Sequence, residues 1–310
     1  MPRTEARHQP VNASGREIGP CNICQASLEQ SRDFRWEKDC YSIFQCPSCG
    51  TLIRGDLPDS DALREIYGPA YFLDASGTTR GQGYSHYLGE EQNHRANAAV
   101  RVRLLERYES PGRLLDVGCA AGFFLDEARR RGWQVQGVEL SGEMAAYARA
   151  QLKLDVWQGS FDDAALEPGT FDVITMWDYL EHSVDPAGDL QRSAALLRPG
   201  GVLAVSTGDA ASIAARVFGR RWHLLTPRHH NFLFTRASLE KAFRRAGFEV
   251  LVAKYSSSLY SLQYLVHKLR TLADWSFLSS LARVIGDSRI GRVAVPVNLF
   301  DIMTVLARRI

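Results

Sequence analysis

The sequence predicts an α/β domain in which helices cover a mostly parallel sheet, preceded by a small cysteine-rich domain. From residue 113 onward, short apolar runs alternate with longer amphipathic stretches, which is typical of strands alternating with helices. A glycine-containing turn follows the first of these runs, and two C-x2-C pairs precede the whole region. The 310 residues leave room for one large domain together with smaller ones.

The composition excludes few classes of function. The chain is 45% hydrophobic and 23% charged, as in ordinary globular proteins, and its net charge of +2 gives no support to a nucleic-acid partner. The first 20 residues are polar and have no apolar run, so neither a signal peptide nor a membrane span is predicted there. The apolar segment 258–284 contains charged residues, which argues against a spanning helix. We therefore expect a cytoplasmic protein.

The expected strands and helices follow one another in order. Strands are predicted at residues 114–117, 134–139, 156–158, 171–177, 202–206, 248–254 and 302–307, and helices at 123–131, 142–152, 187–197 and 236–246. The 47 residues 255–301 are too many for a hairpin between the last two strands. Since apolar residues recur there at helical spacing, a packed helical insertion is expected. A membrane-surface helix is the weaker alternative, because the polar face is not rich in lysine. The predicted domains are a disordered tail (1–19), a zinc-ribbon-like domain (20–57), a helical linker or lid (58–110) and the α/β domain (111–310).

The two C-x2-C pairs indicate a metal site. Their ligands would be Cys21, Cys24, Cys46 and Cys49, whose spacing is close to that of a zinc ribbon. Four thiolates close the coordination of Zn²⁺, so this zinc would be structural and would help a short segment to fold. The alternative is a pair of reduced turns without metal, and Cys40 is interpreted as a spare thiol.

The turn after the first strand runs from Asp116 to Gly122 as D-x-G-x-x-x-G. It lacks the spacing of a dinucleotide fingerprint and the lysine of a P-loop. A carboxylate at the end of the strand suits an ammonium group better than a phosphate. Glu139 ends the second strand, where an acid can accept hydrogen bonds from ribose hydroxyls.

This turn resembles motif I of the class I S-adenosylmethionine-dependent methyltransferases, with Ala120 in place of the middle glycine. Residues 171–178 and 196–203 resemble that family's fourth strand and the turn before its fifth strand. The resemblance covers residues 113–254 and the terminal strand, and it implies a Rossmann-like sheet of seven strands with the last one antiparallel. It also implies S-adenosylmethionine as cofactor, with these residues around it: Asp116, Gly118, Cys119, Ala120, Gly122, Phe123, Glu139, Leu140, Ser160, Phe161 and Trp177.

The segment 178–182, Asp-Tyr-Leu-Glu-His, resembles the "LEH" segment of small-molecule methyltransferases. His182 is the predicted general base, Glu181 an alternative base or orienting partner, and Tyr179 and His229 complete the candidate catalytic set. The alternative is that His182 only shapes the cofactor pocket. A later loop contains Arg216, Arg220, Arg221 and Arg228 together with three histidines, and either binds an anionic group or is a solvated basic loop.

Residues 47–72 resemble, more loosely, the N-terminal part of ribbon-bearing methyltransferases of sugar and surface-polysaccharide pathways. That resemblance implies a lid with Tyr71, Tyr84 and His86 over the substrate. The predicted function is methyl transfer to a hydroxyl, or a carbon, of a small anionic metabolite such as a nucleotide-linked sugar or glycan precursor. One alternative is an RNA methyltransferase that docks through the ribbon, although four basic residues against five acidic ones between residues 21 and 57 give no phosphate-binding surface. The other is a cofactor-binding scaffold without catalysis.

Overall fold

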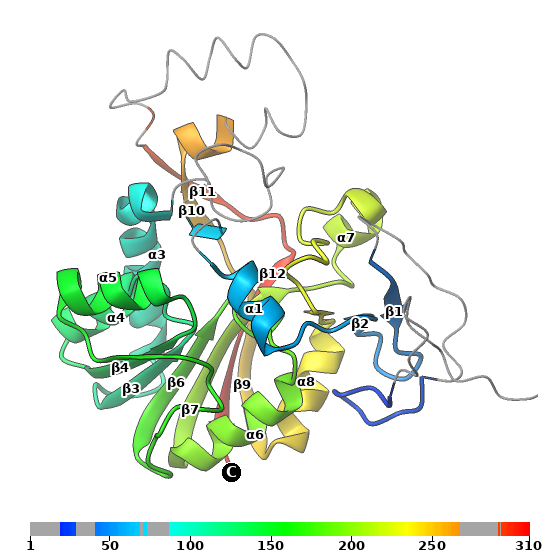
Figure 1. The fold of residues 1–310 in the computed structure, drawn as a ribbon, viewed down its shortest axis with the longest axis horizontal. Coiled ribbons are helices and arrows are strands. Elements are labelled where there is room, and N and C mark those ends of the chain that lie inside the picture. The colour runs from blue at the N-terminus through cyan, green and yellow to red at the C-terminus, as the bar shows by residue number, and fades with distance from the viewer. Residues whose placement is uncertain (1–18, 29–40, 69–70, 73–86, 267–290, 292) are drawn as a thin grey trace, which may run out of the picture.

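A twisted sheet of seven strands forms the centre of the computed structural model, which describes residues 19–28, 41–68, 71–72, 87–266, 291 and 293–310 (Figure 1). The strand order is β5-β4-β3-β6-β7-β12-β9. Five neighbouring strands run parallel, while β12 lies antiparallel between β7 and β9. The predicted fold class, including the antiparallel last strand, is confirmed.

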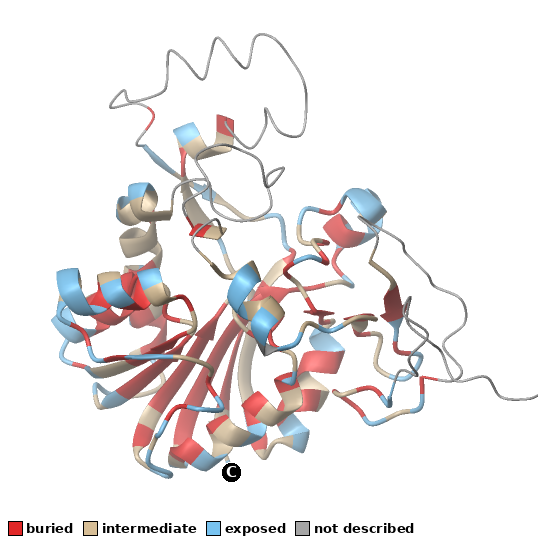
Figure 2. Ribbon diagram, in the orientation of Figure 1, coloured by how far each residue is buried: buried red, intermediate tan, exposed pale blue. Residues whose placement is uncertain are grey.

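The strands of this sheet lie where the apolar runs predict them. They are β3 (Arg113–Val117), β4 (Gln134–Glu139), β5 (Val156–Gln158), β6 (Phe171–Trp177), β7 (Leu197–Gly208), β9 (Phe248–Tyr255) and β12 (Ile302–Arg309). The central strands are buried on both faces (Figure 2), which explains their nearly continuous hydrophobic sequences. Strand β7 is longer than expected because it already begins at Leu197, which pairs with Phe171 of β6 ahead of an irregularity, and it continues to Gly208, which pairs with Ile302 of β12.

Helices cover both faces of the sheet. On one side lie α3 (Glu91–Leu105), α4 (Phe123–Arg130) and α5 (Gly142–Leu152), and on the other α6 (Pro186–Leu196) and α8 (Arg236–Arg245) (Figure 1). Helix α6 begins at Asp185, whose side chain accepts a hydrogen bond from the backbone N–H of Gly188, and α8 begins with a capping box of Thr235 and Ser238. The short helical elements are α1 (Ser60–Ile66), η1 (Tyr87–Glu90), α7 (Ile213–Phe218) and η2 (Gly219–Arg221), of which α1 and α7 are seen above the sheet in Figure 1.

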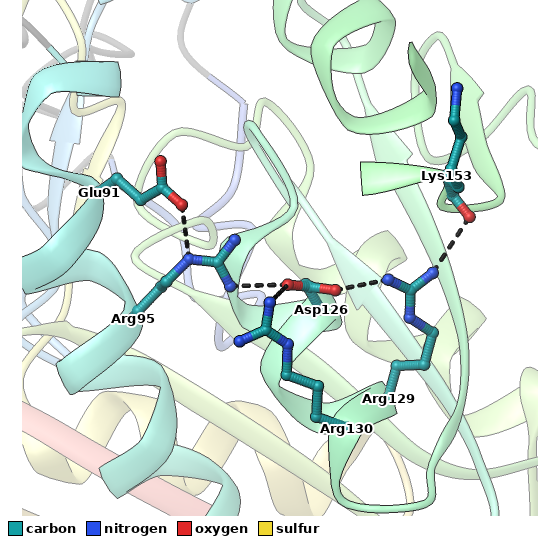
Figure 3. A network of polar contacts seen from close by, with 6 residues as sticks. All are labelled: Glu91, Arg95, Asp126, Arg129, Arg130 and Lys153. Atoms are coloured by element: carbon teal, nitrogen blue, oxygen red, sulfur yellow. Dashed lines mark hydrogen bonds and ion pairs between the residues drawn. The ribbon is translucent and has the colours of Figure 1, made fainter. Parts of the chain in front are cut away.

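An ion-pair network fixes α3 against α4. The buried carboxylate of Asp126 accepts from Arg95 at 2.7 Å, Arg129 at 2.5 Å and Arg130 at 2.9 Å, and Arg95 also contacts Glu91 at 2.6 Å (Figure 3). Burial would raise the pKa of Asp126, but the hydrogen bonds from Arg95 and Arg129 outweigh it and leave the pKa below its ordinary value. The ion pair between Arg95 and Asp126 therefore holds helix α3 against helix α4.

The cysteine-rich segment does not form a separate body. Its two strands, β1 (Ile43–Gln45) and β2 (Leu52–Arg54), pair antiparallel, and β2 also pairs with β8 (Phe232–Leu233) from the loop between β7 and α8. Thr235 at the start of α8 donates to the backbone carbonyl of Cys49 at 3.3 Å. The ribbon and the methyltransferase-like region thus share one small sheet.

The insertion 255–301 begins and ends differently from the expectation. Its described ends contain β10 (Ser258–Ser261) and β11 (Ala294–Val297), which pair antiparallel, and residues 262–266 are helical. Most of the predicted insertion helix lies outside the described residues, as do the tail 1–18, Cys40, Tyr84 and His86. Within the described part of the chain, no helix has both the length and the apolar character needed to cross a bilayer.

Candidate active site

A cavity of about 480 Å³ opens at the carboxyl edge of β3, β4 and β6, the edge where α/β folds bind ligands. The turn beneath it has left-handed backbone at Gly118 (φ 74°), Ala120 (φ 47°) and Gly122 (φ 82°). A Cβ at Gly118 would approach the Tyr179 ring to 2.8 Å, and one at Gly122 would meet Leu154 at 2.5 Å. Both glycines are thus required by close packing as well as by backbone conformation.

Two buried carboxylates stand at this edge. Asp116 accepts from the Thr175 hydroxyl at 2.6 Å, and Glu139 accepts from the backbone N–H groups of Ala120 and Ser141, each at 2.7 Å. Burial raises the pKa of Asp116 to about 7, since the Thr175 hydrogen bond compensates only in part. The pKa of Glu139 is raised by the same cause. A cationic ligand in the cavity would stabilise the ionised form of both groups.

The cavity collects most of the residues that the sequence singled out. Lining it are Asp116, Gly118, Cys119, Ala120, Phe123, Glu139, Leu140, Ser160, Phe161, Trp177, Tyr179, Glu181 and His182. Gly122 and His229 are not among the lining residues. Gly122 begins helix α4, and His229 is buried beside the Tyr71 ring, with the ring centroids 5.0 Å apart.

A polar bridge crosses the cavity wall after β6. Asp178 has a left-handed backbone (φ 54°), and it accepts from Arg101 at 2.8 Å and from the Ser206 hydroxyl at 2.7 Å. The Arg101 guanidinium also lies over the Trp177 ring, 4.8 Å from its centroid. A non-glycine residue with this backbone conformation carries strain, which is common at functional sites.

His182 is held in one tautomer. Its Nδ1 lies 2.9 Å from the backbone carbonyl oxygen of His229, which can only accept, so Nδ1 carries the proton. The Tyr67 oxygen lies 2.8 Å from the same nitrogen, and its hydroxyl donates to the His229 carbonyl at 3.3 Å. Burial lowers the pKa of His182 below its ordinary value, so the ring is neutral near pH 7. The arrangement leaves Nε2 with a lone pair that can accept a proton.

Glu181 and the neighbouring histidines complete the site. Burial, together with the charge of Asp178, raises the pKa of Glu181 to about 8, and its Oε2 has no hydrogen-bond partner among the described residues. Burial lowers the pKa of His229 to about 3 and that of His230 well below the ordinary value. At neutral pH the centre of the site is therefore a neutral carboxyl group beside neutral imidazoles.

Two groups of side chains within the described residues could hold a metal ion. The thiols of Cys21, Cys24, Cys46 and Cys49 all lie within 4.8 Å of one another, as do ligand atoms of Glu181, His182 and His230. In the first group the Sγ atoms of Cys21 and Cys49 are 3.7 Å apart, and those of Cys24 and Cys46 are 3.5 Å apart. Four converging thiols fit the tetrahedral preference of Zn²⁺.

Several cavity residues were not predicted from the sequence. Helix α3 contributes Asn93, His94, Asn97 and Arg101, the segment before it Tyr67, Phe72 and Tyr87, and the insertion Tyr260 and Tyr264. Tyr71, which the sequence predicted as a lid residue, also lines the cavity. The α3 residues follow a spacing of three or four, which places them on one helix face, and this polar stripe was a signal available in the sequence. By contrast, four loop arginines, for which the sequence left open anion binding or a solvated basic loop, do not line this cavity: Arg216, Arg220, Arg221 and Arg228.

The fold and the two carboxylates at its edge define the class: an S-adenosylmethionine-dependent methyltransferase of class I. A family model described as a methyltransferase domain matches residues 89–253, more than half of the chain, and the chain belongs to this family. The match begins at residue 89, so it includes α3.

The similar proteins agree with this class. A ubiquinone biosynthesis O-methyltransferase from Xanthomonas campestris is 35% identical over 179 residues, which cover 54% of this chain and 74% of the relative. The protein of the same name from Aromatoleum aromaticum is 34% identical, over 50% of this chain and 76% of its own. Two solved structures share the fold: the YcgJ protein of Bacillus subtilis (TM-score 0.50, 15% identity, 69% of this chain and 98% of that chain), and a Bacillus halodurans protein provisionally described as a methyltransferase (TM-score 0.51, 16% identity, 68% and 98%).

Proposed function

We propose that this enzyme transfers the methyl group of S-adenosylmethionine to a hydroxyl oxygen of a small molecule that carries an anionic group, with His182 as the general base. The observation that carries the proposal is the neutral His182 ring, whose Nδ1 proton is fixed on the His229 carbonyl and whose Nε2 is available beside the cofactor cavity. The O-methyltransferase names of the relatives support oxygen as the accepting atom. They give no support to the expected sugar-nucleotide or glycan acceptor, since they are named for ubiquinone biosynthesis.

The residues at the cavity fit the cofactor. Asp116 suits its methionyl ammonium group and Glu139 its ribose hydroxyls, because each carboxylate retains accepting capacity beyond the hydrogen bonds it already has. Phe161, buried at the cavity wall, offers an aromatic face to the adenine. Bound there, the sulfonium supplies an electrophilic methyl group for in-line displacement.

The chain's own residues would then act on the acceptor. His182 Nε2 removes the hydroxyl proton as the oxygen attacks, and the carbonyl of His229 stabilises the imidazolium that forms. Glu181 lines the cavity and is neutral in the free enzyme, so its carboxyl group can orient the acceptor hydroxyl by a hydrogen bond. Tyr67, Tyr71 and Tyr87 close the cavity from the segment before α3 and exclude water from the displacement.

We also propose that Cys21, Cys24, Cys46 and Cys49 bind one structural Zn²⁺. The convergence of the thiols supports this, and the four ligands would leave no open position for catalysis. Zinc would order the β1–β2 hairpin, which contains Arg54. The backbone N–H of Arg54 donates to the backbone carbonyl of Asn231 at 2.8 Å. Asn231 in turn donates to the His182 carbonyl at 2.8 Å.

The test is methyl transfer from isotopically labelled S-adenosylmethionine into a metabolite extract, with the products resolved by mass spectrometry. The wild type should yield a labelled O-methylated product, and His182→Gln should bind S-adenosylhomocysteine normally while losing most of the transfer. Wild-type binding without any transfer would instead support the scaffold alternative. If activity is lost on metal chelation while the four cysteines keep their metal, the cluster of Glu181, His182 and His230 holds a catalytic ion, and His182 is not the base.

A further inference from the structure

A second cavity, of about 410 Å³, lies between α3, the edge strand β9 and its neighbour β12. Its wall includes Ser206 at the end of β7, Thr304 at the start of β12 and Lys254 at the end of β9. All three belong to the carboxyl edge of the sheet, where the cofactor cavity also opens. The two cavities share four lining residues, which are Asn97, Arg101, Ser258 and Ile302.

The second cavity is strongly cationic. Five basic side chains line it against a single carboxylate, that of Glu106: Arg101, Arg103, Arg107, Arg131 and Lys254. Glu106 is engaged by Arg131 through two contacts of 2.8 and 2.5 Å. Arg107 and Lys254 form no side-chain hydrogen bond or ion pair with any residue that the structure describes. Arg101 and Arg131 are paired with Asp178 and Glu106, so the charges of Arg107 and Lys254 are the ones that favour an anionic ligand.

The wall of the cavity is built by specific hydrogen bonds. Asn97 of α3 donates to the backbone carbonyl of Leu259 at 2.9 Å and accepts from the Leu259 N–H at 2.8 Å, which fixes β10 on α3. Ser256 donates to the hydroxyl of Thr304 at 2.8 Å. The Asp126 network also holds α3 against α4 (Figure 3). Hydrogen bonds and ion pairs therefore connect α3, α4 and β10 around this cavity.

Guanidinium groups, an ammonium group and several hydroxyls together suit the oxygens of a phosphate or diphosphate. The Arg101 guanidinium joins the two cavities, because it reaches Asp178 at the wall of the cofactor cavity. An acceptor with its hydroxyl near His182 and its anionic group on the far side of Arg101 would occupy both spaces. The arginines of the loop 216–228 line neither cavity.

We propose that this second cavity binds the phosphate or diphosphate group of the acceptor, so that Arg107 and Lys254 determine specificity for a phosphorylated substrate. The inference rests on the proposed transfer to an anionic acceptor. It places the anionic group of the acceptor in the second cavity and not at the arginines of the loop 216–228.

The experiment uses the full-length protein and inorganic pyrophosphate as the probe. Calorimetry should give saturable pyrophosphate binding to the wild type, weakened about tenfold or more in Arg107→Gln/Lys254→Gln, since two charge-assisted contacts are lost. The matched control is Arg221→Gln/Arg228→Gln, which removes the same charge from the loop and should leave the affinity unchanged. S-adenosylhomocysteine should bind all three proteins equally, which reports an intact cofactor site.

Pyrophosphate should also inhibit methyl transfer into a metabolite extract in the wild type, and less so in Arg107→Gln/Lys254→Gln. The inference is overturned if pyrophosphate does not bind saturably, if both double variants weaken it equally, or if it binds without affecting methyl transfer. Failure of the proposed function would give a different result. The wild type would then bind S-adenosylhomocysteine normally but would transfer no methyl group.

Discussion

Replacing Asp116 with asparagine gives the sharpest test of the cofactor site. The amide oxygen of the introduced side chain can keep the hydrogen bond from Thr175, but the cavity would then face an NH2 donor where the methionyl ammonium group needs an acceptor. The loss of one charge-assisted hydrogen bond weakens binding by about 1.5–3 kcal/mol, which corresponds to about 10- to 150-fold in the Kd of S-adenosylhomocysteine.

The same carboxyl gives the binding a pH dependence. Because burial raises the pKa of Asp116 to about 7, the free protein must release a proton before it can pair with the ammonium group. The affinity of the wild type should therefore rise about tenfold between pH 6 and pH 8, and Asp116→Asn should lack this rise. Isothermal titration calorimetry in buffers of different ionisation enthalpy would measure both the affinity and the proton released.

One further variant and one stability measurement test the same role of Asp116. Thr175→Val removes the hydrogen bond that lowers the pKa of Asp116, so the rise in affinity should move to higher pH. Since a raised carboxyl pKa contributes stability that is lost as pH rises through the folded value, Asp116→Asn should be at least as stable as the wild type at pH 8. Equal affinity of Asp116→Asn and the wild type at pH 8 would refute the assigned role.

The other predictions concern the base, the ribbon, the α3–α4 network and the turn. The lowered pKa of His182 predicts a kcat that falls as the pH drops below about 6.5. His182→Gln should lower kcat about 100-fold or more and abolish this fall at low pH. Cys46→Ser should reduce the bound zinc measured by mass spectrometry to well below one ion per chain, and a zinc content equal to that of the wild type would contradict the site. Asp126→Asn should cost about 1–3 kcal/mol in chemical denaturation at pH 7; since its folded pKa is depressed, the difference should disappear as pH falls through that value. Gly118→Ala should weaken binding of S-adenosylhomocysteine, because its left-handed backbone and a contact of 2.8 Å with the Tyr179 ring leave no room for a Cβ; unchanged affinity would show that Tyr179 can move at little cost.

The sheet could be predicted from the sequence because its signals are local. A strand such as β6 is a mostly apolar run between polar turns, and its predicted bounds, 171–177, agree with the structure. The positions of Asp116 and Glu139 followed as well, since parallel strands end at one edge and their terminal acids must meet there.

What could not be predicted depends on contacts between distant residues. Strand β8 has only two residues and exists because β2 pairs with it. The β10–β11 pair joins segments separated by more than 30 residues, and the proline at position 296 argued against a strand there. In the sequence, arginines are close together in the loop 216–228, which favoured that loop as the anion site, whereas the second cavity brings together Arg107 and Lys254, which are far apart in the sequence.

The small sheet formed by β1, β2 and β8 also determines how the chain can be divided. A fragment that starts at residue 89, where the family match begins, would keep the seven-stranded sheet but leave β8 without β2 and Asn231 without the Arg54 contact. The loop that supports His182 would then lose part of its support. Residues 1–88, which also include the cavity-lining Tyr67, and this fragment, expressed as separate chains, should regain activity only when they are mixed. The ribbon is thus better described as an integral part of the enzyme's fold than as an accessory domain attached to it.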